Sequence, residues 1–346
     1  MKHELPVPRL LPVGTLRRLS AVLTLAALAG SGALATSPAG ASTEAASGRH
    51  AACIKPAQRT TKWREGADTS EVSRAVRAKV DRAVHAVTGG ASTRTSALPA
   101  HVRVPVMIHV IHGSRRGEHR INKHKARRMF RTLKAGFAGA QNPAMAPTGV
   151  NFKLKRITIS RNERWFHAAP FSRADRQMKN RLHRGNAHTL NIYVNRPKSG
   201  GQLLLGYSLF PWQRRTHKTL DGVTISEVSL PGGKAVGYNL GDTVIHETGH
   251  WMGLLHTFEG GCSDGDGVFD TPAEASASYQ CLEGRNTCPV VFDPVANAYV
   301  AVDDGPANVD PIHNFMDYSY DFCMNHFTPG QRERMIALFM VYRYGR

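Results

Sequence analysis

The segment from His246 to His256, HETGHWMGLLH, constrains the fold most, because it places three histidines and one glutamate within eleven residues. Residues four apart face the same side of a helix, so His246 and His250 can present both imidazoles to one metal ion. Gly253 can adopt a positive φ, which ends the helix and lets the chain turn until His256 supplies a third nitrogen. The segment therefore predicts a helix, a glycine turn and a metal site with three histidine ligands.

The residues around these ligands predict chemistry at the metal. Three histidine nitrogens with an open fourth position are typical of a catalytic rather than a structural zinc site. Zinc lowers the pKa of bound water from about 15.7 toward 7, and Glu247 is placed to act as general base and then to protonate the leaving amine. A short H-E-x-x-H segment also occurs by chance, with its histidines held by solvent or core partners. Here Gly253 and His256 stand at the offsets of the longer H-E-x-x-H-x-x-G-x-x-H pattern, so we predict hydrolysis of peptide bonds.

The N-terminal residues 1–41 are typical of a signal peptide. Basic residues precede a short apolar run, Leu19–Ala29, and two small-x-small sites follow it. We expect residues 42–98 to be a propeptide or an N-terminal extension, and residues 99–346 to be the catalytic domain. No apolar run reaches the roughly 18 residues that span a bilayer, so we expect a secreted, extracellular protein without a transmembrane anchor.

Charge is unevenly distributed along the chain. The net charge is +19, yet residues 251–325 contain twelve Asp and Glu against one basic residue, Arg285. The remaining, strongly basic part predicts either nonspecific contact with anionic surfaces or a solvated cationic surface, and no specific nucleic-acid partner. An alternative to the enzyme is therefore a cationic secreted binding module with a vestigial zinc site, although the intact Glu247 argues against it. A metallohydrolase acting on non-peptide substrates is a third option.

Apolar periodicity predicts a mixed α/β protein with two unequal lobes. Pro105 in the first strand suggests an edge or a bulge position. Val72, Val76, Val80, Val84 and Val87 share one face of the first predicted helix. The predicted helices cover residues 70–87, 122–140, the histidine segment and 328–341, and the predicted strands cover 102–111, 152–159, 190–194, 203–210 and 222–228.

Several separated motifs occur in a fixed order: LLGYSLFPW, DGVTI, HETGHWMGLLHTF, GGC, GDGVFDTP and NFMDYSYDFCMNHFTPGQRERM. Together they resemble the pappalysin-type metzincins, a family of zinc metalloproteases, over about residues 190–335. The resemblance implies an α/β (α+β) fold of the metzincin-like zincin type. Its upper lobe would contain a twisted mixed sheet and two helices, and its irregular, disulfide-stapled lower lobe would end in a C-terminal helix.

The resemblance also implies roles for residues after the histidine segment. Met316 matches the methionine turn, which gives the histidines an apolar, polarisable floor. Tyr318 matches the family tyrosine, whose hydroxyl can donate to the oxyanion of the tetrahedral intermediate. The predicted partners are protein or peptide substrates. They would pair with the strand at Leu203–Phe210, and Asp321 is a candidate residue of a pocket for a basic side chain just past the scissile bond.

In an oxidising compartment the cysteines can form disulfides, and four clustered cysteines allow three pairings. The resemblance implies Cys262–Cys288 and Cys281–Cys323. Cys53 stands apart, and three interpretations stay open for it: a latency switch on the zinc, an intermolecular bridge or a free thiol.

Asp264, Asp266 and Asp270 lie in a glycine-broken loop, CSDGDGVFDTP. Carboxylates and carbonyls on a tight loop suit Ca²⁺, which the family often carries here. The alternative is an acidic, solvated loop. The expected cofactors are therefore Zn²⁺ at the histidines and, as a second option, Ca²⁺ at this loop.

Overall fold

The chain divides into two units, Met1–Pro56 and Ala57–Arg346. The computed structural model describes residues 63–64, 72–89, 98–118, 121–288, 290–293, 298–301 and 309–345, all in the second unit. The predicted signal peptide and Cys53 lie outside the described residues. Among the described helices, none is both long and apolar enough to cross a membrane.

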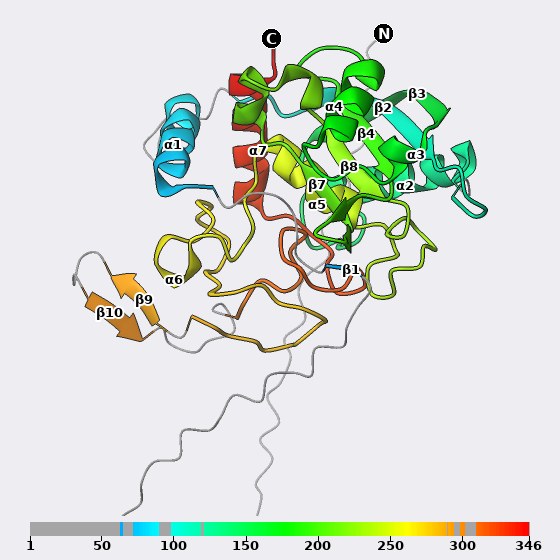
Figure 1. The fold of residues 1–346 in the computed structure, drawn as a ribbon. Coiled ribbons are helices and arrows are strands. Elements are labelled where there is room, and N and C mark those ends of the chain that lie inside the picture. The colour runs from blue at the N-terminus through cyan, green and yellow to red at the C-terminus, as the bar shows by residue number, and fades with distance from the viewer. Residues whose placement is uncertain are drawn as a thin grey trace, which may run out of the picture. The chain divides into compact units, whose positions relative to one another are not determined.

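The central element is a five-stranded sheet in the order β3-β2-β4-β8-β7 (Figure 1). Four strands are parallel, and β7 alone runs antiparallel, on β8 at one edge. A single antiparallel strand therefore forms the edge that follows β8. The strands span Val102–His112 (β2), Val150–Arg161 (β3), Leu190–Asn195 (β4), Gly206–Ser208 (β7) and Val223–Ser226 (β8).

The strand that contains Pro105 is not an edge strand. β2 pairs with β3 on one side and with β4 on the other, so the edge alternative is wrong, while the bulge alternative agrees with the ladder. The pairing of β2 with β3 does shift register between Val106 and Met107, one residue beyond the proline. The missing N–H of the proline is thus accommodated inside the sheet, next to an irregularity of the ladder.

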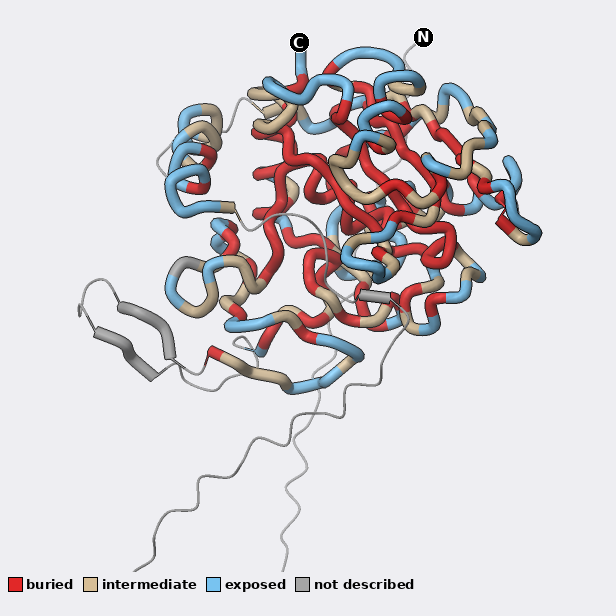
Figure 2. Tube along the Cα trace, in the orientation of Figure 1, coloured by how far each residue is buried: buried red, intermediate tan, exposed pale blue. Residues whose placement is uncertain are grey.

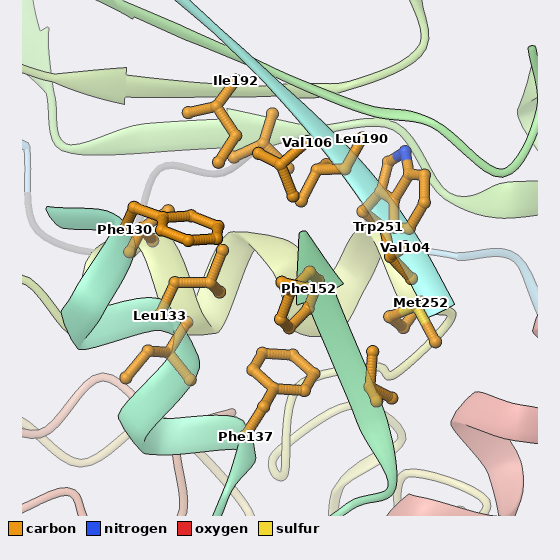
Figure 3. Close-up of a cluster of buried hydrophobic side chains, with 14 of the residues drawn as sticks. Val104, Val106, Phe130, Leu133, Phe137, Phe152, Leu190, Ile192, Trp251 and Met252 are labelled. Atoms are coloured by element: carbon orange, nitrogen blue, oxygen red, sulfur yellow. The ribbon is translucent and has the colours of Figure 1, made fainter. Parts of the chain in front are cut away.

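Three helices supply most of the remaining core: α2 (Lys123–Phe137), α5 (Thr243–Met252) and α7 (Pro329–Tyr342). All ten residues of α5 are buried, and the apolar face predicted for α2 packs inward. Figure 2 shows the buried trace concentrated over the sheet and these inner helices. Side chains from β2, β3, β4, α2 and α5 interdigitate in this core (Figure 3), including Val104, Val106, Phe130, Leu133, Phe137, Phe152, Leu190, Ile192, Trp251 and Met252.

Shorter elements were absent from the prediction. Two further helices, α3 (Glu163–Phe166) and α4 (Arg173–Leu182), lie between β3 and β4 in the chain. They add to the two helices that were predicted for the upper lobe. The sequence of α4, RADRQMKNRL, contains too few apolar residues to give a clear helical period. Two 3₁₀ helices, η1 (Pro211–Arg215) and η2 (Lys218–Leu220), connect β7 to β8.

The lower lobe is largely irregular, as predicted, and is cross-linked by two disulfides. Cys262–Cys288 and Cys281–Cys323 have Cα–Cα distances of 5.4 and 5.6 Å, and they are the pairs that the resemblance implied. This lobe also contains α6 (Gly261–Asp264) and the antiparallel pair β9 (Val290–Asp293) and β10 (Ala298–Ala301).

Two segments of the predicted N-terminal extension lie on this unit. β1 (Trp63–Arg64) pairs in parallel with β6 (Gln202–Leu204), which also pairs with β5 (Lys198–Ser199). α1 (Arg74–Thr88) packs on α7. Residues before the predicted catalytic domain are therefore part of the folded unit.

Candidate active site

Three histidine side chains converge on one point. The Nε2 atom of His250 lies 3.1 Å from the Nε2 of His246 and 3.1 Å from the Nε2 of His256. All three residues are buried. Zn–N bonds of about 2.0–2.1 Å in a tetrahedron place ligand nitrogens about 3.3 Å apart, so the spacing of these nitrogens fits one zinc ion. The structure thus brings together the three ligands predicted from sequence.

The opposite ring nitrogens fix the orientation of the imidazoles. His246 Nδ1 donates to the carbonyl oxygen of Phe315 at 2.7 Å, and His250 Nδ1 donates to that of Leu254 at 2.7 Å. Because Nδ1 carries the proton in these hydrogen bonds, the lone pair of each Nε2 can point toward the place where the three Nε2 atoms converge. His256 Nδ1 instead faces the Glu259 carboxylate, with 3.5 Å to Oε2. Sequence reasoning missed Glu259, although its place three residues after a ligand was the available signal.

Gly253 produces the turn between the second and third ligands. It caps α5 with φ of +106°, and its N–H bonds to carbonyls of the last turn. An added Cβ would also overlap the Leu338 side chain of α7. Both the backbone conformation and the close helix contact therefore require glycine here.

The predicted general base is confined by the edge strand. Glu247 is buried, and a Cβ built on Gly206 of β7 would lie 2.6 Å from Glu247 Oε1 and 2.8 Å from its Cγ. The strand can approach the carboxylate this closely only because residue 206 has no side chain. The segment LLGYS contains Gly206, but no neighbouring residue in the sequence indicated that this glycine faces Glu247.

Met316 lies beneath α5, fully buried. A Cβ on Gly249 would overlap the Met316 sulfur, so this glycine between the first two ligands makes room for the methionine. The Met316 N–H donates to Asn314 Oδ1 at 2.9 Å, and Asn314 exchanges amide hydrogen bonds with Gln331 of α7. The methionine turn is thereby tied to the start of the last helix, and the role of Met316 as a floor for the site stays a prediction.

The Tyr318 hydroxyl lies 3.0 Å from His256 Nε2, beside the point where the three nitrogens meet. Its backbone carbonyl accepts a hydrogen bond from the Tyr238 hydroxyl at 2.9 Å. A hydroxyl donor therefore lies next to the place where the three histidine Nε2 atoms converge. The predicted role of Tyr318 requires this position.

Asp321 lies beside the N-terminus of α5. Its Oδ2 accepts from the N–H groups of Leu240 and Gly241 at 2.7 and 2.9 Å. Among the described residues its Oδ1 has no hydrogen-bond partner. Burial raises the pKa of Asp321 to about 6, and burial together with the charge of Asp321 raises the pKa of Asp242 to about 8. Both carboxylates line a pocket of about 600 Å³ that Arg128 and Arg131 also border. The assignment of Asp321 as a specificity residue stays a prediction.

The acidic loop does not gather its carboxylates on one point in the part that the structure describes. Asp266 is buried, and its Oδ1 accepts from the Val268 N–H at 2.9 Å. Asp270 accepts from the Thr328 hydroxyl at 2.6 Å and from the Gly330 N–H at 2.8 Å, so it caps α7. The side chain of Asp264 is outside the described residues. These contacts do not by themselves support calcium at this loop.

A second group of potential metal ligands, Glu118, Glu163 and His167, already has charged partners. His167 Nε2 lies 3.1 Å from Glu118 Oε1, and Arg196 and Arg115 lie 3.9 and 3.6 Å from the Glu118 and Glu163 carboxylates. Guanidinium groups thus offset these carboxylates without a metal, and we assign the cluster a structural role.

The C-terminal end of α5 has a partner that the sequence did not indicate. Arg343 is fully buried and donates to the Trp251 carbonyl through Nη2 at 2.8 Å. It also pairs with Asp221 at 2.9 Å, and Asp221 accepts from the Trp251 indole at 3.1 Å. A cation at this end of a helix is favourable for the helix dipole. The cluster fixes the helix that carries two of the three histidines.

Comparison with known proteins indicates the same family of metalloproteases that the sequence motifs resemble. A family profile described as pregnancy-associated plasma protein-A, peptidase family M43, matches residues 173–340. The extracellular metalloprotease of Pyricularia oryzae is 42% identical over 207 residues, covering 59% of this chain and 66% of that protein. Extracellular metalloprotease 1 of Coccidioides posadasii is 40% identical over 209 residues, covering 59% and 67%. The chain spans just under two thirds of the length of the first of these curated relatives.

Solved structures agree with this comparison. Mature mirolysin of Tannerella forsythia, solved with a cleaved peptide, has a TM-score of 0.54 and 27% identity, covering 69% of this chain and 92% of that chain. A promirolysin mutant, at 24% identity, shares the fold with a TM-score of 0.59 over 80% of this chain and 94% of that chain. The chain belongs to the pappalysin family of metallopeptidases, which confirms the resemblance inferred from the motifs.

Proposed function

We propose that the chain is a secreted, zinc-dependent endopeptidase. The convergence of three histidine Nε2 atoms beside the buried Glu247 is the observation that carries the proposal. The relatives named above are described as extracellular metalloproteases, and the N-terminal sequence is typical of a signal peptide. Both observations support secretion.

Zinc fits the ligands, because neutral imidazoles in a compact group of three suit this ion and leave a position open. When bound, zinc supplies a Lewis acid that makes water reactive near neutral pH and polarises the scissile carbonyl. Glu247 accepts the proton of the attacking water and transfers it to the leaving nitrogen. The Tyr318 hydroxyl donates to the oxyanion as the carbonyl carbon becomes tetrahedral.

A peptide substrate would bind along β7. This strand pairs with β8 on one side and, among the described residues, with no strand on the other. An extended peptide can add to such an edge through main-chain hydrogen bonds, which do not depend on its sequence. Because β7 also contacts α5, the added peptide would pass next to Glu247. Asp321, beside the N-terminus of α5, is the candidate for a preference for a basic side chain just past the scissile bond.

Nonspecific contact with anionic surfaces is a secondary part of the proposal. The sequence of α2, KHKARRMFRTLKAGF, has no acidic residue and exposes its lysines and arginines. The sequence of β3, VNFKLKRITISR, also lacks acids. Such a face attracts polyanions, although lysines on an edge strand also prevent sheet-to-sheet association. A binding module with a vestigial metal site is less favoured, because the ligands and Glu247 are all in place.

Casein digestion by the purified protein, with and without a zinc chelator, tests the proposal. We expect activity that the chelator abolishes, that added zinc restores, and that Glu247→Ala lacks while still binding zinc. Activity that survives chelation, or an active Glu247→Ala variant, would remove the metallopeptidase assignment. Salt-sensitive retention on a heparin column, measured separately, tests the anionic contact.

A further inference from the structure

The first helix attaches to the catalytic unit through an arginine as well as through its valine face. Of the residues within α1, Arg77 and Val80 are buried, and Val80 belongs to the face that five valines share. Val76 is 36% exposed. Figure 1 shows α1 beside α7, above the loop that contains α6. The buried arginine indicates that polar contacts, together with Val80, fix how α1 docks.

The buried arginine binds the acidic loop. The Arg77 guanidinium donates to the carbonyl oxygen of Gly265. A Cβ on Gly260 would overlap this guanidinium, so the loop backbone is closely fitted around it. Farther along the loop, the Gly267 carbonyl accepts from Arg334 Nη1 of α7 at 3.1 Å, and the same Nη1 pairs with Asp81 of α1 at 2.8 Å.

These two guanidinium groups bind two loop carbonyls of the kind that calcium uses as ligands. Carbonyl oxygens and carboxylates on a tight loop are ordinary Ca²⁺ ligands. Here the carbonyls of Gly265 and Gly267 face arginines, and both oxygens of Asp270 bind the start of α7. A divalent cation at these carbonyls would also be repelled by two adjacent guanidinium charges. The described part of the loop therefore does not fit Ca²⁺ while α1 is docked.

One group in the loop still indicates a cation site. Asp266 is only 2% exposed, and its Oδ2 has no hydrogen-bond partner among the described residues. A buried carboxylate oxygen without a partner is costly unless a positive charge lies nearby. Burial raises the pKa of Asp266 to about 7, while the Val268 N–H and the Arg334 guanidinium act to lower it. Arg77 and Arg334 therefore supply positive charge beside this loop.

We propose that Arg77 and Arg334 take the place of calcium in ordering residues 259–270, so that α1 stabilises this loop as a bound ion would. The contact also reaches the metal centre, a step that rests on the proposed function. The Val72 N–H, just before α1, donates to Glu259 Oε1 at 2.8 Å, and Glu259 Oε2 faces His256 Nδ1 at 3.5 Å. Docking of α1 therefore orders both the loop and the carboxylate behind the third histidine.

Thermal unfolding of the full chain in zinc-containing buffer, with and without about 10 mM CaCl₂, tests the proposal without any measurement of activity. The wild-type melting temperature should not respond to calcium. Arg77→Ala should melt roughly 5 °C lower, because a charge-assisted hydrogen bond is lost, and calcium should restore part of that difference, since Arg334 still binds the Gly267 carbonyl. Arg82→Ala is the matched control, because Arg82 is exposed on the same helix, and it should melt like the wild type.

Three outcomes would contradict the proposal. A wild-type protein stabilised by calcium would show that the loop binds the ion with α1 docked. An Arg77→Ala variant with unchanged melting would show that Arg77 does not order the loop. A destabilised variant that ignores calcium would show that the guanidinium does not occupy a cation position. Calorimetric titration of CaCl₂ gives a second measurement: no binding to the wild type, and a Kd of about 10⁻⁴–10⁻³ M for Arg77→Ala.

Discussion

Replacing Gly206 by alanine should reduce catalysis while leaving the fold and the zinc site intact. The new Cβ would lie 2.6 Å from Glu247 Oε1 and 2.8 Å from Glu247 Cγ. Ordinary contacts need about 3.4 Å, so the carboxylate must move by about 0.8 Å, and a displacement of that size can cost about 10²-fold in rate. Because the overlap includes Glu247 Cγ as well as the carboxylate, the whole buried side chain must shift, and we expect the melting temperature to fall by only a few degrees. Gly206 has no positive φ, so alanine adds no backbone strain.

The assay is steady-state cleavage of a peptide substrate, with zinc content and thermal unfolding measured on the same preparation. We expect kcat to fall by about 10²-fold with one zinc per chain retained, because Glu247 is not a ligand. Wild-type kcat would refute the inferred contact between β7 and the general base. Loss of zinc in proportion to loss of activity would show that the substitution acts through the histidines instead.

Three further predictions concern groups around the site. Glu259→Gln should weaken zinc binding by about 10- to 100-fold in a chelator competition, because His256 loses its carboxylate partner; unchanged affinity would exclude that role. Replacing Cys281 and Cys323 by serine opens a loop closed across 42 residues, and should lower the free energy of unfolding by about 4 kcal/mol in urea titrations; a loss under about 1 kcal/mol would contradict the chain-entropy argument. Burial and the neighbouring Asp321 raise the pKa of Asp242 to about 8. Between about pH 4 and pH 8 the folded state therefore binds more protons than the unfolded state, and the free energy of unfolding falls as the pH rises. Asp242→Asn should therefore gain stability relative to wild type between about pH 5 and pH 8, and parallel profiles would refute the assignment.

Local sequence rules predicted the parts of the site that are local in the chain. His246 and His250 converge because they are four residues apart on α5, and Gly253 ends that helix with a positive φ. β2 and α2 followed from apolar periodicity, since alternate residues of the first half of β2 and one face of α2 are buried. All residues of β4 and β8 are buried, and the strand predicted at 203–210 is divided between β6 and β7, which belong to different sheets. The family motifs added Met316, Tyr318 and the disulfide pairs, which spacing alone could not assign.

Long-range partners could not be read in this way. Gly206 contacts Glu247 from 41 positions away, and Arg343 reaches Trp251 from 92 positions away. The valines of α1 gave a helical period and Val80 of that face is buried, but the contact of Arg77 with the Gly265 carbonyl could not be predicted from it. The position of Pro105 in an inner strand depends on strand order, which no local pattern specifies.

The central claim is that one zinc ion binds His246, His250 and His256. X-ray absorption at the zinc edge, with metal analysis of the same purified protein, tests it most directly. We expect one zinc per chain with three imidazole nitrogens at about 2.0–2.1 Å and one lighter oxygen donor, and loss of that signal in His250→Ala. A zinc-free wild-type protein, or a zinc edge dominated by sulfur ligands, would contradict the account.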